Sequence, residues 1–259
     1  TNYNQNVIQL ATRLENQLLF FSNYIFKNHI NDNLLLIRRD TILTQSVKRS
    51  NDSRKKYFET DTLIPSDIAY SNYFSSNVDT NLMSFKEIIV KSNVIDSIYH
   101  QLDTLGMKNV IIIPSDDNVF VTDLLSKLHA CRDTSMIVYG MPNLSNFDHI
   151  SIYDLMDMRV TFPHNKIFNH SDLNNFIIHF YSHYNYMPNV KHASVGYESG
   201  IYFLDILIKY GSILSNLDDY GPKTILGKTY HFEKKKNGGY ENKATLIFQY
   251  EDFRCKTIY

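Results

Sequence analysis

The sequence has no tryptophan, only two cysteines, and few glycines and prolines. The cysteines, Cys131 and Cys255, lie far apart and form no Cys-x-x-Cys pair. This excludes a disulfide-rich scaffold and a cysteine-rich zinc site. Two alternatives stay open for them. They pair in an oxidising compartment, or they are two separate thiols, which is the simpler interpretation.

The charge shows no excess of either sign. With 26 Lys and Arg against 27 Asp and Glu, the net charge is -1, whereas nucleic-acid-binding proteins usually carry a basic excess. We therefore expect no nucleic-acid partner. Long apolar runs are also missing, since no stretch reaches the roughly 18 apolar residues of a transmembrane helix. The start, "TNYNQNVIQL", has neither the basic residues nor the apolar core of a signal peptide, so an exported protein would be present here in a mature or trimmed form.

Motifs for nucleotide binding and catalysis are absent as well. Neither GxGxxG nor GxxxxGK[ST] occurs, and there is no GxSxG elbow. His179 and His183 have the four-residue spacing of metal ligands, but Phe180 stands where a zincin has glutamate, and no third ligand is identifiable. We interpret this helix face as half-exposed surface. The sequence predicts no enzyme, no cofactor and no metal site.

Short apolar runs alternate with amphipathic stretches through the first 140 residues. Strands are predicted at 33–39, 84–91, 109–114 and 135–140, and helices at 9–28, 42–58, 94–106 and 118–130. Strands and helices that alternate with short links are typical of a parallel sheet covered by helices on both faces. Right-handed crossovers then give an α/β, doubly wound, Rossmann-like lobe.

The pattern changes after Gly140. A strand is predicted at 158–163, and helices are predicted at 172–184 and 193–210. The tail alternates at 230–233 and 244–250, and Asn237-Gly238-Gly239 between these runs is typical of a hairpin turn. We expect this β-hairpin to close the chain outside the parallel sheet.

The loop "PSDD", Pro114 to Asp117, follows the third predicted strand and precedes a helix. Open α/β sheets bind ligands outside the carboxyl ends of their strands, and helix N-termini offer free N–H groups. Ser115 is therefore a candidate for holding an anionic ligand group. The alternative is that Ser115, Asp116 and Asp117 only cap the helix.

The order of these segments resembles a known family. "NVIIIPSDDNVFVTDLLSKLHA", "IVYGMPNLSNFDHISIYDLMDMRVTFP", "NNFIIHFYSHYNYMPNVKHASVGYESGIYFLDILIKYG" and "LGKTYHFEKKKNGGYENKATLIFQY" resemble type I periplasmic binding proteins of the branched-chain amino-acid receptor class. The closest resemblance is to a divergent Bacteroidota branch that often carries a LysM peptidoglycan-binding module. The resemblance covers about Asn6 to Tyr250. It rests on the order and spacing of the segments, because no single motif is diagnostic.

The resemblance implies a two-lobed organisation. Residues 7–150 would form lobe two, 151–225 would return with helices of lobe one, and 226–259 would form a C-terminal β-hairpin at the hinge. The family begins with a segment that forms most of the first lobe's sheet, whereas this chain starts where the second lobe would start. The resemblance therefore implies a partial lobe one.

The implied function is that of a non-catalytic, periplasmic solute-binding protein. It would take a small ligand, an amino acid or a peptide-like molecule, into an interlobe cleft by hinge closure. The candidate ligand-binding residues are Ser115, Asp116, Tyr139, Tyr197 and Glu198. Ser115 would bind a ligand carboxylate and Glu198 its ammonium group, with Tyr139 as an aromatic wall.

In the family, the helix that carries Tyr197 and Glu198 starts at the cleft. Gly196 and Gly200 are then expected to allow close backbone approach at the helix start. Glu198 equally suits the positive end of the helix dipole without any ligand, so both interpretations stay open.

A second interpretation is a degenerate binding-protein fold that serves as an accessory or scaffold subunit of a cell-envelope or outer-membrane protein complex. The partial lobe one and the abundance of tyrosine favour it. Both interpretations imply a periplasmic protein, with lipid anchoring to a membrane as one variant. Its partners would be a small ligand or an envelope complex, with peptidoglycan reached through an N-terminal module.

Overall fold

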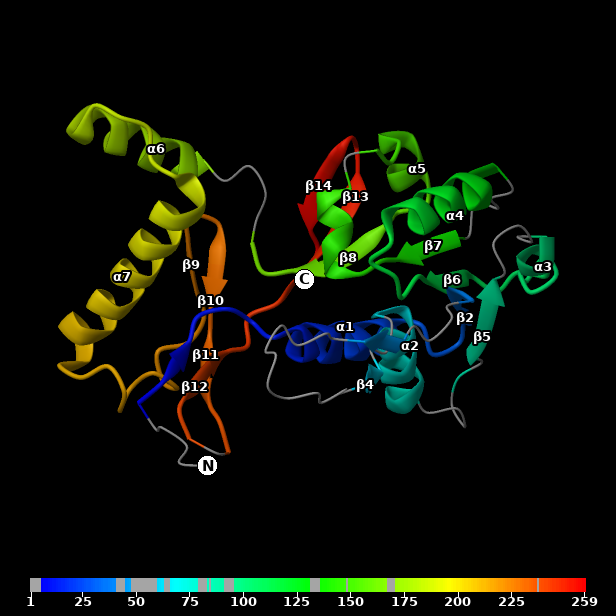
Figure 1. The fold of residues 1–259 in the computed structure, drawn as a ribbon, viewed down its shortest axis with the longest axis horizontal. Coiled ribbons are helices and arrows are strands. Elements are labelled where there is room, and N and C mark those ends of the chain that lie inside the picture. Colours follow the sequence, from blue (N-terminus) through cyan, green and yellow to red (C-terminus); the bar gives the residue numbers. More distant parts are fainter. Residues whose placement is uncertain are drawn as a thin grey trace. The chain divides into compact units, whose positions relative to one another are not determined.

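The computed structural model describes residues 6–40, 45–47, 60–62, 66–78, 83, 85–90, 96–130, 136–147, 149–166, 171–236 and 238–259. The chain forms two compact units (Figure 1). Unit 1 comprises Thr1–Phe21, Pro163–Phe248 and Cys255–Tyr259, and unit 2 comprises Ser22–Phe162 and Gln249–Arg254.

The helices are α1 Leu14–Asn28, α2 Ser66–Asn77, α3 Asp96–Tyr99, α4 Asn118–Ala130, the 3-10 helix η1 Pro142–Asn146, α5 Ile152–Asp157, α6 Ser171–Tyr184 and α7 Val190–Tyr210. The strands are β1 Ile8–Gln9, β2 Asn33–Arg39, β3 Gln45–Val47, β4 Thr60–Thr62, β5 Phe85–Val90, β6 Asn109–Ile112, β7 Met136–Tyr139, β8 Thr161–His164, β9 Lys223–Ile225, β10 Lys228–Tyr230, β11 Phe232–Lys234, β12 Tyr240–Asn242, β13 Leu246–Glu251 and β14 Arg254–Thr257. None of the described helices has the length and apolar character that crossing a bilayer requires.

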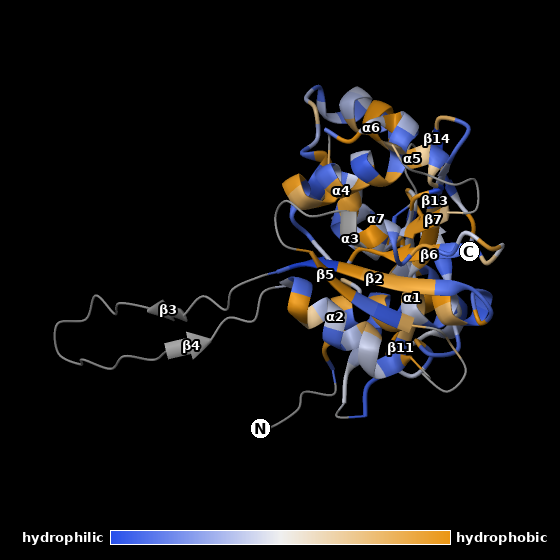
Figure 2. Ribbon diagram, turned by 90° about the vertical axis from the view of Figure 1, so that its right-hand side faces the viewer, coloured by the Kyte–Doolittle hydropathy of each residue, from blue (hydrophilic) through white to orange (hydrophobic). Residues whose placement is uncertain are grey.

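Unit 2 contains a parallel sheet in which β5, β2, β6 and β7 are neighbours in that order. Every residue of β6 and β7 is buried, and β2 is largely hydrophobic (Figure 2). Strands covered on both faces read as continuous apolar runs, which is why the sequence predicts them well. The buried residues of α4 follow the helical repeat that one apolar face requires, namely Val121, Leu124, Leu125 and Leu128. The predicted α/β fold class with a parallel-rich sheet is confirmed.

The C-terminal strands differ from the prediction. The turn is where we expected it, with Gly238 and Gly239 at positive φ (90° and 73°), but β11 pairs antiparallel with β12. Residues 246–251 instead form β13, which lies beside β8 in the larger sheet, where the Tyr250 amide donates to the Val160 carbonyl (3.1 Å). The expectation that the chain closes outside the parallel sheet is therefore wrong. Alternation marks a strand but does not identify its partner.

Two predicted helices also differ. Within 42–58, Gln45–Val47 is a strand that pairs antiparallel with Thr60–Thr62, and the rest of that range lies outside the described residues. The range has too weak an apolar repeat to give a helix a face to bury.

Of the helix predicted at 94–106, the described residues, which begin at 96, form only α3. Asp103 organises the loop that follows, because one of its carboxylate oxygens accepts the amides of Leu105, Gly106 and Met107 at 2.9–3.0 Å. These bonds replace helical ones, and they lower the pKa of Asp103.

Unit 1 is organised around α7. Its buried residues recur every fourth position and form one stripe, made of Ser194, Glu198, Tyr202 and Ile206. This stripe packs on an aromatic cluster from the small strands, and the Tyr202 ring centroid lies 5.5 Å from Tyr230 and 5.3 Å from Phe232. The helix ends at Gly211, whose φ of 73° places it in the left-handed region that glycine favours.

The start of α7 corrects the interpretation of its two glycines. The helix begins at Val190, so Gly196 and Gly200 lie in its interior. A Cβ atom added at either position would meet no atom within 4 Å. The expected helix start at these glycines is therefore wrong, whereas close approach of a ligand to their backbone stays a prediction. Glu198 is also too far from the helix start for the dipole interpretation, because the dipole acts only within the first turn.

Replacing either glycine by alanine is expected to stabilise the protein. Gly196→Ala and Gly200→Ala should each raise the free energy of unfolding by about 0.5–1 kcal/mol, because glycine loses more backbone entropy in a helix. Urea denaturation followed by circular dichroism measures this change. Gly211→Ala is the control and should lower stability by about 1–2 kcal/mol, since alanine is strained at positive φ. A loss of stability at Gly196 would show that the space above it is filled.

Candidate functional site

A polar cluster in unit 2 lies at the carboxyl ends of β2 and β6. β2 ends at Arg39, and the chain leaves β6 at Ile112 and enters α4 at Asn118. Since β2 and β6 are parallel, both ends lie at the same edge of the sheet. This is the edge outside which open α/β sheets bind ligands.

The loop between β6 and α4 confirms one of the predicted caps. Asp117 Oδ1 accepts the Phe120 amide at 2.9 Å, so Asp117 caps the helix. Ser115 is 2% exposed, and its Oγ accepts the Asp117 amide at 3.2 Å. Ser115 thus shapes the loop, and its role toward an anionic ligand group stays a prediction.

Arg39 joins this loop to α2. Its Nη1 donates to Asp117 Oδ2 at 2.6 Å, and its Nε lies 3.2 Å from Asp67 Oδ2. Asp67 is only 1% exposed. Sequence reasoning missed Arg39 and Asp67, although a charged residue at the end of a buried strand is a usable signal.

The two carboxylate oxygens of Asp116 differ in their hydrogen bonding to the described residues. Its Oδ2 accepts the Tyr70 hydroxyl at 2.6 Å, and burial together with this carboxylate raises the pKa of Tyr70. Its Oδ1 is buried, and no described residue gives it a hydrogen bond. A buried acceptor without a donor is costly, so Asp116 can accept a hydrogen bond from an amine or a hydroxyl of a ligand.

Tyr139 is 3% exposed at the end of β7. Its hydroxyl lies 2.6 Å from His29 Nε2, and His29 Nδ1 lies 2.6 Å from Asp32 Oδ2. Burial lowers the pKa of His29 and raises that of Tyr139. Tyr139 therefore belongs to a buried polar chain within unit 2, and its role as an aromatic wall stays a prediction.

Tyr197 and Glu198 are neighbours on α7, yet their surroundings differ. Tyr197 is 46% exposed, with its ring centroid 5.0 Å from that of Phe176 on α6. Glu198 is 1% exposed; its Oε2 accepts the Tyr230 hydroxyl at 3.0 Å, and its Oε1 is buried without a described partner. Burial raises the pKa of Glu198, against the opposing effects of the Tyr230 hydrogen bond and of nearby Lys166 and Lys228.

The predicted ligand residues thus divide between the units. Ser115, Asp116 and Tyr139 belong to unit 2, whereas Tyr197 and Glu198 belong to unit 1. The predicted pairing of Ser115 with Glu198 on one ligand stays a prediction. What the two sets share is a buried carboxylate oxygen without a described partner, on Asp116 and on Glu198.

Unit 1 also has a groove between α6, α7 and the β9–β10 turn, here called the α6–α7 groove. Its volume is about 760 Å³, and its lining consists of Asp172, Asn175, Phe176, His179, Phe180, His183, Tyr184, Ala193, Tyr197, Ile201, Thr224, Ile225 and Leu226. His179 and His183, which have metal-ligand spacing, both lie here and are exposed. Among the described residues, no three metal-ligating side chains come together. Cys255 is a free thiol, and Cys131 lies outside the described residues.

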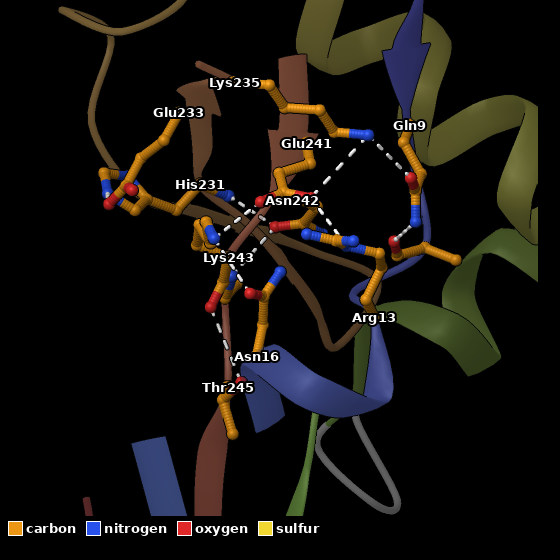
Figure 3. Close-up of polar contacts among 12 residues, drawn as sticks. Gln9, Arg13, Asn16, His231, Glu233, Lys235, Glu241, Asn242, Lys243 and Thr245 are labelled. Carbon is orange, nitrogen blue, oxygen red and sulfur yellow. Dashed lines mark hydrogen bonds and ion pairs between the residues drawn. The ribbon is translucent and has the colours of Figure 1, made fainter. Parts of the chain in front are cut away.

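A second buried carboxylate in unit 1 lies among three cations. Glu241 on β12 is 4% exposed and contacts three cations, with Lys243 Nζ at 2.6 Å, Arg13 Nε at 2.8 Å and Lys235 Nζ at 3.7 Å (Figure 3). Burial raises the pKa of Glu241, but the hydrogen bonds from Lys243 and Arg13 outweigh burial and lower the pKa to about 2. These contacts tie the chain start to β12, beside the parallel pairing of β1 with β12.

The Glu241 contacts predict a pH-dependent stability. Because the folded-state pKa of Glu241 lies below its ordinary 4.5, its contribution is complete above pH 4.5 and is lost as the pH falls toward about 2. Glu241→Gln should cost about 1.5–3 kcal/mol at pH 7, and urea titrations should show a smaller difference from the wild type at pH 3. Glu233→Gln is the control, because Glu233 is exposed and 3.6 Å from His231. Equal costs at both pH values would contradict this account.

The sequence matches no protein-family model and no curated protein sequence. Its fold does have solved counterparts. An ABC transporter substrate-binding protein from Desulfitobacterium hafniense in complex with Leu is similar at 12% identity and a TM-score of 0.51, over 94% of this chain and 65% of that one. A second structure of an ABC transporter substrate-binding protein from that organism gives 12% identity and a TM-score of 0.56, over 97% and 67%.

A protein assigned as a branched-chain amino acid ABC transporter from Rhodospirillum rubrum gives 12% identity and a TM-score of 0.59, over 96% of this chain and 66% of that one. The chain therefore shares the α/β fold of these solved structures, and the predicted fold class is confirmed. It spans about two thirds of the length of these structures. At this level of identity the likeness concerns the fold alone.

Proposed function

We propose that the protein is a non-catalytic, periplasmic solute-binding protein for a small ligand, an amino acid or a peptide-like molecule. The observation that carries the proposal is the buried oxygen of Asp116, which lacks a described partner at the carboxyl edge of a parallel sheet. Ligands of open α/β sheets bind at this edge. The fold shared with substrate-binding proteins supports the same function.

In this proposal Asp116 accepts a hydrogen bond from the ligand, and Ser115 beside it holds a ligand carboxylate. Glu198 is the partner of the ligand's ammonium group, with Tyr197 and Tyr139 as aromatic neighbours. Residues 7–150 then act as lobe two, 151–225 as the part that returns to lobe one, and 226–259 as the segment at the hinge. A ligand that contacts both lobes favours the closed state.

A thermal-shift screen tests the proposal. The ligands are the standard amino acids, short peptides and muropeptides, and the protein is the chain of residues 1–259. A ligand present at 100 times its Kd stabilises the folded state by about 2.7 kcal/mol, so a true ligand should raise the melting temperature in a concentration-dependent way. A flat response across the whole panel would remove the solute-binding proposal.

A second candidate is an accessory subunit of a cell-envelope complex. The observation that favours it is the number of large, exposed apolar side chains on α6 and α7, among them Ile178, Leu204 and Ile208. Isolation of a stable, stoichiometric complex from native membranes would support the accessory role. So would the absence of ligand binding by the chain. A periplasmic location is part of both candidates. The proposal has three finer parts: lipid anchoring, a LysM module and an origin in Bacteroidota. The sequence of the gene and of its neighbours in the genome would test them.

A further inference from the structure

Glu241 on β12 lies among more positive charges than it can balance. The nearest side-chain nitrogens of Arg13, Lys235 and Lys243 lie 2.8, 3.7 and 2.6 Å from its carboxylate oxygens. Burial would raise the pKa of Glu241, but the hydrogen bonds from Lys243 and Arg13 lower it to about 2, so the carboxylate is ionised at neutral pH. Three positive charges against one negative charge leave an excess of two. These four residues are here called the Glu241 cluster (Figure 3).

The cations of the cluster are open to solvent, whereas the carboxylate is not. Side-chain exposure is 5% for Glu241, 30% for Lys235 and Lys243, and 46% for Arg13. The buried carboxylate therefore holds together cations from three segments that are distant in the sequence, namely the residue before α1, the residue after β11 and the residue after β12. An anion that approaches from solvent meets the cations first, because the carboxylate is almost wholly buried.

The cross-strand neighbour of Glu241 does not cancel this excess. Glu233 on β11 is opposite Glu241 in the register of the two strands, but its side chain is 56% exposed and its Oε1 lies 3.6 Å from His231 Nε2. Figure 3 shows the Glu233 and His231 side chains together and apart from Arg13. Because solvent screens an exposed charge of this kind, Glu233 contributes little to the field at the cluster.

The cluster also has hydrogen-bond donors to spare. A guanidinium carries five N–H donors, and the Arg13 side chain contacts no described side chain other than Glu241. Lys243 Nζ lies 2.6 Å from Glu241 and donates to Asn16 Oδ1 at 2.8 Å, which uses two of its three donors. In the described part of the chain, Asn16 Nδ2 is buried without a hydrogen-bond partner. A buried donor without an acceptor is costly, and an acceptor from a ligand would remove this cost.

We propose that the Glu241 cluster binds a phosphate monoester, either of a soluble small molecule or of a lipid headgroup. A phosphate monoester carries about −1.5 to −2 charges near pH 7, which matches the excess of two positive charges. Its oxygens suit the planar fork of Arg13, because arginine binds phosphate through two parallel N–H···O bonds. The proposal does not depend on the solute-binding function, since no residue of the cluster is among the candidate ligand residues of that function.

Other anions fit the cluster less well. A single carboxylate would balance only one of the two excess charges. A nucleic acid needs a basic surface that extends along its backbone, whereas the chain has a net charge of -1 and the cluster gathers its three cations around one carboxylate. One compact dianion is therefore the class of ligand that the charges and the donors favour.

Isothermal titration calorimetry of the chain of residues 1–259 with glycerol 3-phosphate tests the proposal for a soluble ligand. All titrations are made in chloride at one ionic strength, because salt screens exposed charges. Saturable binding of one ligand per chain is expected, and Lys235→Met should weaken it by about fivefold or more. Lys234→Met is the matched control, because it removes the same charge from the neighbouring residue, which is exposed and in no described ion pair. It should change the affinity by less than about twofold.

Arg13→Lys keeps the charge beside Glu241 and removes the fork, so this variant should stay folded by circular dichroism and bind glycerol 3-phosphate about fivefold more weakly. Flotation with phosphatidylcholine vesicles, with and without phosphatidic acid, tests the lipid headgroup. Flotation that requires phosphatidic acid, and that Lys235→Met reduces while Lys234→Met does not, would identify a lipid as the source. The proposal is overturned if neither phosphate monoester binds, if Lys235→Met and Lys234→Met bind equally, or if Arg13→Lys binds as tightly as the wild type.

Discussion

Arg39→Met is expected to lower the free energy of unfolding by about 1–3 kcal/mol, the cost of leaving a buried polar group unsatisfied, because solvent screens part of the pair at the Arg39 side chain, which is 41% exposed. Arg39 lies between Asp67 and Asp117, with Nε 3.2 Å from Asp67 Oδ2. Asp67 is 1% exposed, so the substitution leaves a buried carboxylate without its counter-charge. Methionine keeps most of the apolar stem of arginine, which separates the loss of charge from the loss of packing.

Arg38→Met is the matched control for this prediction. Arg38 is the neighbouring residue on β2, and its Nε donates to Glu87 Oε1 at 2.6 Å. The Glu87 side chain is 36% exposed, so this pair should contribute about 0–1 kcal/mol. Urea denaturation measures both variants, and Arg39→Met combined with Asp67→Asn should recover part of the loss. Similar costs for Arg38→Met and Arg39→Met would contradict the importance of the buried Asp67 carboxylate.

Glu198→Gln is expected to weaken ligand affinity by 2–5 kcal/mol, or roughly 30- to several-thousand-fold. In the proposed binding mode, the substitution takes a desolvated carboxylate away from the ligand's ammonium group. The melting temperature of the free protein should hardly change. The glutamine carbonyl can still accept the Tyr230 hydroxyl, which Glu198 Oε2 accepts at 3.0 Å, and the variant no longer buries an ionisable group.

Tyr230→Phe is the control that separates binding from structure. It removes the donor to Glu198 and leaves the ring packed, so it should cost about 1–3 kcal/mol of stability. Affinity is measured by calorimetry with the ligand from the thermal-shift screen. An unchanged affinity in Glu198→Gln would assign Glu198 a structural role only.

The sequence alone predicts the parallel sheet well, for a physical reason. β2 and α4 have the predicted bounds, Asn33–Arg39 and Asn118–Ala130. A strand buried on both faces needs an unbroken apolar run, and a packed helix needs an apolar stripe. Both patterns can therefore be recognised within a short stretch of sequence. The C-terminal strands were less predictable, since the partner of β13 is β8, far away in the sequence.

The candidate site was predictable in part. Ser115 and Asp116 could be placed at a strand's carboxyl end, because that follows from local pattern. The Tyr70 partner of Asp116 and the Asp67 partner of Arg39 could not, since both come from α2, distant in sequence from β6.

The burial of Glu198 did leave a local signal. It lies four residues after Ser194 and four before Tyr202, on the buried stripe of α7. The helix was predicted at 193–210, and the same four-residue repeat within that range already assigns Glu198 to the packed face.

The most direct test of the central claim is isothermal titration calorimetry of the wild type and Asp116→Asn with the ligand panel. The claim is that the polar cluster at the carboxyl edge of the unit 2 sheet binds a small ligand. It predicts a saturable heat of one ligand per chain for the wild type. For Asp116→Asn, which puts an amide donor where the ligand's donor would meet Oδ1, it predicts a loss of affinity of about tenfold or more. No heat from the wild type with any panel member, or equal affinity in the two proteins, would contradict it.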